Sequence, residues 1–118
     1  MATHLDIGKA GEKLAEAYLV QNDYTILHRN WRFHHDEIDL IAVKNNLIHF
    51  VEVKYRSSNY HGHPEEAVNK KKIKTLLRCI EQFLFLHPQY NDFRLDILSI
   101  TQKQGEEAAY FFIEDVTI

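Results

Sequence analysis

Two short stretches of the sequence carry acidic and basic residues at a spacing that could do chemistry. Glu37 and Asp39 are separated by one residue, and Glu52 and Lys54 have the same spacing. Side chains alternate between the two faces of a β-strand, so each pair would lie on one face. Each strand would therefore present charged side chains among apolar neighbours.

The dipeptide Asn45-Asn46 between these stretches predicts how they pair. Asparagine tolerates the positive φ angles of a type I′ turn, so the flanking strands should form a two-residue hairpin. Counting back from this turn, Asp39 would face Glu52, and Glu37 would face Lys54. Directly opposed Cβ atoms lie about 4.5–5.5 Å apart, and like charges at that distance destabilise a sheet. The opposed carboxylates therefore need a compensating feature.

Three features could compensate the repulsion: a raised pKa on one acid, a nearby basic side chain or a bound cation. The carboxylates are hard oxygen donors beside Lys54, and this donor set suits Mg²⁺ or Mn²⁺ better than zinc. Mg²⁺ leaves its other positions to water and substrate phosphate, which is a geometry for phosphodiester cleavage. The alternative is a solvated sheet face whose charges pair across the strands. The apolar neighbours, Ile41, Val43, Ile48 and Phe50, argue against that alternative.

Glu12 is a candidate third carboxylate. It lies on an expected amphipathic helix with Gly8, Ala15 and Leu19 at neighbouring helical positions, a small and apolar surround that suits close packing. Its functional interpretation is a side chain aimed at the metal site. The alternative is an ordinary surface glutamate near a helix N-terminus.

The basic residues concentrate in the middle of the chain. Residues 28–78 carry ten Lys/Arg against six Asp/Glu, whereas the remaining residues carry four against eleven. Residues that track phosphates are therefore expected in this segment. The candidates for nucleic-acid contact are Arg29, Arg32, Arg56, Lys70, Lys74 and Arg78, the last three in an i, i+4, i+8 stripe. The alternative for the stripe is a solvated helix face, and Trp31, which could stack on a base, is equally suited to the core.

Other candidate residues indicate ordinary structural roles. His34-His35 and His61-x-His63 fall in expected loops without the spacing of a known zinc site, so surface histidines are the favoured interpretation. Arg94 and Asp96 share a strand face and are expected to form a structural ion pair. Cys79, the single cysteine, lies in an apolar helical run and is expected to be a small buried residue.

Length and composition bound the class of protein. The chain has 118 residues, 45% of them hydrophobic, which predicts one compact domain over 1–118 and argues against a transmembrane protein. Its net charge of −3 argues by itself against a nucleic-acid binder, but the uneven charge distribution reverses that argument. The N-terminus lacks the basic and apolar regions of a signal peptide, so the cytoplasm is the expected compartment.

Local patterns predict the elements that must position these residues. Apolar residues at three- and four-residue steps predict helices over 7–20 and 65–86, the first capped by Asp6 or Thr3 and the second opened by Pro64. β-Branched and aromatic runs predict strands over 24–33, 37–44, 47–56, 93–101 and 110–114. The resulting order, α-β-β-β-α-β-β, predicts an α/β fold with a mixed central sheet flanked by helices.

Several of these motifs, taken in order, resemble the PD-(D/E)xK nuclease superfamily, whose fold is restriction-endonuclease-like. The string Glu37-Ile38-Asp39-Leu40-Ile41-Ala42, followed by Val51-Glu52-Val53-Lys54-Tyr55-Arg56, looks like its D…ExK core. More specifically, the chain resembles the YraN family of small bacterial proteins, which are related in fold to archaeal Holliday-junction resolvases. The supporting motifs are Gly11-Glu12, Arg29-Asn30, Gly62-x-Pro64-x-Glu66-Ala67-Val68 and Arg94-x-Asp96. The family usually has glycine before the Glu37 position, where this chain has Asp36.

The resemblance implies a role for each matching residue. Asp39 and Glu52 would be metal ligands, with Mg²⁺ or Mn²⁺ as the cofactor. Lys54 would orient the attacking water or stabilise the pentacovalent phosphorus, and Glu12 would be an accessory carboxylate from the helix.

The function expected from the residues and the resemblance is a metal-dependent endonuclease. Its partner would be nucleic acid rather than a membrane, with DNA as the favoured substrate, branched DNA included, and a homodimer as a candidate assembly. The alternative is a non-catalytic module that keeps the nuclease fold and binds nucleic acid or a protein.

Overall fold

The order of helices and strands is that expected from the sequence. A computed structural model describes residues 4–57 and 69–116, with only the backbone for residues 4–8. The elements are α1 (His4–Gln21), β1 (Thr25–Phe33), β2 (Asp36–Lys44), β3 (Leu47–Arg56), α2 (Lys70–Leu86), β4 (Phe93–Thr101) and β5 (Ala109–Ile113). Every strand boundary lies within one residue of the predicted position, and the predicted α-β-β-β-α-β-β order is confirmed.

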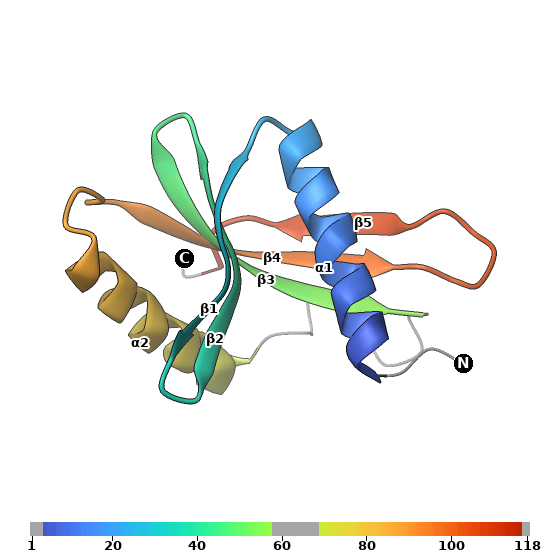
Figure 1. Cartoon of the computed structure of the whole chain (residues 1–118), viewed down its shortest axis with the longest axis horizontal. Helices are drawn as coiled ribbons and strands as arrows, with labels where there is room; N and C mark the ends of the chain where they lie inside the picture. The colour runs from blue at the N-terminus through green and yellow to red at the C-terminus, as the bar shows by residue number, and fades with distance from the viewer. Residues whose placement is uncertain (1–3, 58–68, 117–118) are drawn as a thin grey trace.

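The five strands form one mixed sheet in the order β1-β2-β3-β4-β5 (Figure 1). All neighbouring strands are antiparallel except β3 and β4, which run parallel. Parallel neighbours cannot be joined by a tight turn, so the chain crosses over between them, and α2 lies in that connection. The expected mixed sheet flanked by helices is therefore confirmed.

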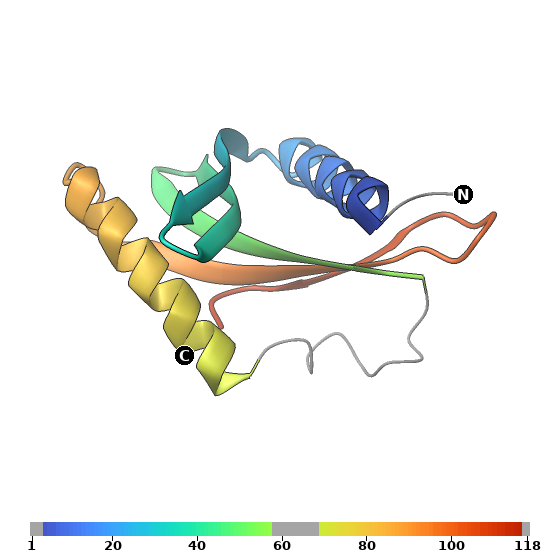
Figure 2. The same cartoon turned by 60° about the horizontal axis from the view of Figure 1, so that its bottom comes forward.

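The two helices cover opposite faces of the β3–β4 pair. Phe50 and Leu95, which are paired in register, are buried in the cluster that contains the apolar side of α2. Val51 and Leu98 point to the other face and are buried with Ala15 of α1. Figure 2 shows α1 and α2 on either side of the long strands. Neither helix, within the described ranges, is long and apolar enough to cross a membrane.

The β2–β3 turn is the predicted Asn45-Asn46 turn. The two asparagines have φ angles of 53° and 64°, as a type I′ turn requires. The register that follows pairs Lys44 with Leu47 and continues to Leu40 with Val51, as counted from the sequence. The turn chemistry therefore determined the pairing of the first five residues on each side.

The helix starts differ from the predictions. α2 begins at Lys70 rather than near residue 65, because the Asn69 side chain accepts a hydrogen bond from the Lys72 N–H at 2.9 Å and caps the helix. α1 begins at His4 rather than Ile7, so Asp6 lies inside the helix and is not its cap. The predictions for Thr3, His61, His63 and Pro64 lie outside the described residues.

A second correction concerns the expected ion pair between Arg94 and Asp96. Asp96 is fully buried and contacts His49 Nδ1 at 2.7 Å, while its other oxygen accepts from the Asp115 N–H at 2.8 Å. Arg94 instead lies near Asp92 and Asp115, at 3.2 and 3.4 Å. His49, which is paired with Arg94 in the β3–β4 register, is itself buried and is the side chain that contacts Asp96.

We expect Asp96→Ala to destabilise the fold by about 2–4 kcal/mol, because it leaves buried polar groups around position 96 without their acceptor. Urea unfolding of the two proteins measures the difference. Glu107→Ala, at an exposed position, should change the unfolding free energy by less than about 0.5 kcal/mol. A loss at Asp96 no larger than that of this control would show that the buried pair contributes little.

Candidate active site

β2 and β3 separate at the point where the acidic residues lie. The ladder between them ends at Leu40 and Val51. Beyond it, among the described residues, β2 is paired with β1, and β3 is paired with β4, where Lys54 lies opposite Ser99. We call this point the β2–β3 fork, formed by Asp39 on β2 and by Glu52 and Val53 on β3. The predicted pairing of Glu37 with Lys54 is wrong, because Glu37 faces Arg32 on β1. The predicted pair of Asp39 and Glu52 is not part of the β2–β3 ladder either, although the two side chains meet across the fork.

The fork opens because the β1–β2 hairpin packs against α2. Ile38, Trp31 and Phe33 belong to the cluster that contains Leu76 and Phe83 of the helix. Figures 1 and 2 show this end of the hairpin leaving the plane of β3 and β4 and lying beside α2. Trp31, whose ring lies 5.2 Å from that of Phe83, therefore belongs to the core rather than to a base-stacking surface.

The Asp39 carboxyl lies inside the fork. Its Oδ2 accepts a hydrogen bond from the Val53 N–H at 2.8 Å, so a side chain serves a backbone donor where the ladder has ended. Burial, followed by a hydrogen bond with Glu52 and the negative charge of Glu52, raises the pKa of Asp39 to about 9. The two predicted acids are therefore adjacent, and their environment favours the protonated form of Asp39.

Glu52 forms an ion pair with Lys72, a residue that was not among the candidates named from the sequence. Its side chain is almost completely buried, and Lys72 Nζ of α2 lies 3.2 Å from its Oε2. The signal was present in the sequence, since Lys72 precedes Leu76 by one helical turn and lies on the stripe that continues through Cys79 and Phe83. A lysine on a buried stripe indicates a partner under the helix.

Lys54 lies two residues after Glu52 on β3, and alternation places both side chains on one face of the strand. The side chain is partly exposed. Within residues 4–57 and 69–116, no hydrogen bond or ion pair is found for its ammonium group. The ammonium group of Lys54 can therefore bind a further ligand beside the two acids.

α1 brings Glu12 toward the same region. A Cβ at position 11 would lie 2.6 Å from the Cβ of Tyr55, so only glycine lets the helix approach β3 this closely. With its amide oriented to satisfy its neighbours, Asn30 donates to Glu12 at 2.8 Å and to Glu37 at 2.9 Å. The charge of Glu12 also contributes to the raised pKa of Asp39. Glu12 is thus near the fork but held by Asn30.

The donors at the fork fit a magnesium-like ion. Asp39 and Glu52 supply hard carboxylate oxygens, and Mg²⁺ commonly uses one or two carboxylates with water filling its other positions. In the part of the chain that the structure describes, no three His, Cys, Asp or Glu side chains converge as metal ligands. A divalent cation could replace the proton on Asp39 and the lysine ammonium on Glu52, because it would neutralise both carboxylates.

The six predicted phosphate-contact residues lie on three elements, α2, β1 and β3. Lys70, Lys74 and Arg78 are exposed on one side of α2, and Lys74 and Arg78 line a shallow hollow with Lys71. Arg29 and Arg32 lie on β1, where Arg29 is bound by Glu16 at 2.6 Å and Arg32 lies 3.9 Å from Glu37. Arg56 ends β3 and has interactions of its own. The α2 group therefore offers the more open cationic surface.

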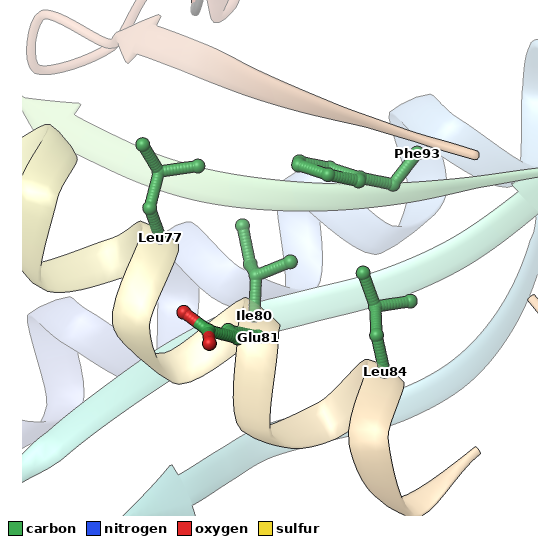
Figure 3. A pocket seen from close by; sticks show the side chains of 5 residues that line it. All are labelled: Leu77, Ile80, Glu81, Leu84 and Phe93. Carbon is green, nitrogen blue, oxygen red and sulfur yellow. The ribbon is translucent and has the colours of Figure 1, made fainter. Parts of the chain in front are cut away.

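Other surface features are separate from the fork. His34 and His35 form the exposed β1–β2 turn, as expected for surface histidines, and Cys79 is buried, as predicted. Asp36 is the first residue of β2 and does not have a positive φ angle, whereas His34 in the preceding turn has a φ angle of 57°. Figure 3 shows an apolar hollow between α2 and the start of β4, lined by Leu77, Ile80, Glu81, Leu84 and Phe93. It contains neither fork acid.

Comparison with known sequences gives consistent matches. The profile described as "Uncharacterised protein family UPF0102" matches residues 11–100. A UPF0102 protein of Bacteroides thetaiotaomicron is 43% identical over 105 residues, which are 89% of this chain and 87% of the relative. A UPF0102 protein of Chloroherpeton thalassium is 40% identical over 123 aligned positions, which cover 98% of this chain and 95% of the relative. One of Cytophaga hutchinsonii is 41% identical over 115 residues, 98% of each chain.

The raised pKa of Asp39 predicts how stability depends on pH without metal. Asp39 ionises near pH 3.9 in the unfolded chain and near 9 in the folded one, so the folded state binds more protons between these values. Stability in EDTA should therefore fall as the pH rises from 5 to 9, by at most about 1.4 kcal/mol per pH unit from this group.

Urea unfolding at several pH values tests this prediction. Asp39→Asn cannot ionise, so its stability should fall less steeply with pH than that of the unmodified protein. Asp23→Asn, in the exposed α1–β1 turn, should keep the original slope. Equal slopes for Asp39→Asn and the unmodified protein would contradict the assignment of the proton to Asp39.

Proposed function

We propose that this chain, which belongs to the uncharacterised protein family UPF0102, is a metal-dependent endonuclease that hydrolyses phosphodiester bonds of nucleic acid. The observation that carries the proposal is the β2–β3 fork. There, two adjacent carboxyls lie beside Lys54 and Lys72 on a sheet face that is otherwise apolar. A pure binding surface has no need of two acids that repel each other in a buried position.

Each fork residue has a part in the proposed reaction. Asp39 and Glu52 would hold Mg²⁺ or Mn²⁺, and such an ion, when bound, supplies activation of water and neutralisation of phosphate charge. Lys54 would hold the oxygen of the scissile phosphate or orient the attacking water. Glu12, held by Asn30, would act as an accessory acid that accepts a hydrogen bond from water at the site.

The substrate would approach over the cationic side of α2. Lys70, Lys74 and Arg78 are exposed there, and each can neutralise a backbone phosphate without reading sequence. DNA is the favoured substrate, with branched DNA among the forms to test. A homodimer acting in the cytoplasm would place two such sites on one duplex.

Cleavage of labelled DNA tests the proposal. Duplex, single-stranded and branched DNA are incubated with Mg²⁺ or Mn²⁺ and the full chain. Asp39→Asn and Glu52→Gln should each lower the rate at least about a hundredfold, because each removes a charge that acts in the transition state. Glu81→Gln, an exposed acid on α2, serves as the matched control and should cleave normally.

Two outcomes would count against the proposal. Cleavage that persists in purified Asp39→Asn would assign the activity to another site or to a contaminant. Binding of DNA without cleavage of any form, and without Mn²⁺ uptake in calorimetry, would favour the non-catalytic binding module instead.

The cationic side of α2 gives a separate prediction. The double variant Lys74→Gln, Arg78→Gln should weaken DNA binding for all sequences alike and reduce the slope of log K against log salt by about 2. Fluorescence anisotropy between 50 and 200 mM salt measures this slope. Lys103→Gln, in the β4–β5 turn, should leave it unchanged. An unaltered slope in the double variant would place the nucleic acid elsewhere.

A further inference from the structure

Lys72 occupies a position on α2 where an apolar residue would be expected. The buried side of the helix runs through Leu76, Cys79, Ile80 and Phe83, and Lys72 lies one turn before Leu76 on the same side. The Asn69 cap fixes the backbone of this turn through the Lys72 N–H. The ammonium is thereby directed under the helix to Glu52, whereas Lys70, Lys71 and Lys74 are exposed.

The cation is costly where it stands. Lys70, Lys71 and Lys72 form the first turn of α2, which contains no acidic residue. The N-terminus of a helix carries partial positive charge, so a lysine there lowers the stability of the helix. Helix stability therefore does not explain Lys72, and its contact with Glu52 does.

The contact is also well suited to exchange. The Glu52 side chain is 6% exposed and cannot turn to water, whereas the Lys72 side chain is 42% exposed and can move outward. In the described part of the chain, Lys72 is the cation found on Glu52. A divalent ion that binds at the fork can therefore displace the Lys72 ammonium from the Glu52 carboxylate.

We propose that Lys72 is a counter-ion that a divalent cation displaces from Glu52, and that its freed ammonium then holds a phosphate of the substrate. This inference rests on the proposed function of the fork. Without metal, Lys72 and Glu52 neutralise each other. When metal is bound, the ion binds Glu52 in place of Lys72. The ammonium groups of Lys72 and Lys54 are then both uncompensated positive charges that attract an anionic ligand.

Two effects of opposite sign follow from this role. Removing the ammonium removes a competitor for Glu52, so metal should bind more tightly. The same change removes a phosphate contact, so nucleic acid should bind less tightly in the presence of a divalent ion. A lysine that only supported the fold would weaken both interactions together or neither.

Calorimetric titration with Mn²⁺ measures the first effect on the full chain. Lys72→Met should bind Mn²⁺ about tenfold more tightly than the unmodified protein, while Lys72→Arg, which keeps the charge, should remain within about twofold. Lys103→Met has the same change in net charge far along the chain and should bind like the unmodified protein. Thermal melts with and without Mn²⁺ keep the test valid if Lys72→Met is less stable, because the metal should then raise its melting temperature by more.

Anisotropy of a labelled 20-base-pair DNA duplex in Ca²⁺ measures the second effect. Ca²⁺ has the same charge as Mg²⁺ and, like Mg²⁺, binds oxygen ligands. Lys72→Met should bind this duplex about five- to tenfold more weakly than Lys103→Met does, and Lys72→Arg should retain binding. Equal DNA affinity for Lys72→Met and Lys103→Met would overturn the phosphate contact.

The Mn²⁺ titration separates failure of this inference from failure of the proposed function. Mn²⁺ binding that is lost in Asp39→Asn but is no tighter in Lys72→Met would overturn the role of Lys72 and leave the metal site standing. Absence of Mn²⁺ binding to the unmodified protein, or binding that Asp39→Asn leaves intact, would overturn both.

Discussion

The hydrogen bond from the Val53 N–H to the Asp39 carboxyl is the interaction on which the site depends. When two strands separate, the backbone donors at the point of separation lose their partners and need another acceptor. Asp39 supplies that acceptor and is thereby held inside the sheet beside Glu52. The fork thus places an acid in the fold and also makes its negative charge unfavourable.

Several features of the fork are unfavourable in the protein by itself. Asp39 has a raised pKa, Glu52 is buried, and Lys72 lies at the wrong end of a helix for a cation. Each of these lowers the stability of the metal-free protein, and the proposed divalent ion would compensate the two carboxyls, while the freed Lys72 would need an anionic ligand. Local conflicts of this kind are expected where residues are retained for function rather than for stability.

Two helices from distant parts of the chain complete the site. Gly11 permits α1 to touch Tyr55, which brings Glu12 within reach of Asn30 on β1. Asn69 fixes the start of α2 and thereby the direction of Lys72. The exposed side of the same helix carries Lys74 and Arg78. One helix therefore supplies both a charge to the fork and a surface beside it.

The sequence by itself determined the features that depend on neighbouring residues. The Asn45-Asn46 turn predicted the hairpin and its first five pairs, and strand alternation brought Asp39 and Glu52 to the same place, although not as a ladder pair. Tertiary structure alone decided where the ladder ends, because Ile38 and Trp31 pull the β1–β2 hairpin onto α2, far along the chain. It also decided which buried acid Lys72 contacts, and it paired Asp96 with His49 rather than with Arg94. Turn and strand preferences act over a few residues, whereas the choice of a partner depends on which elements pack together.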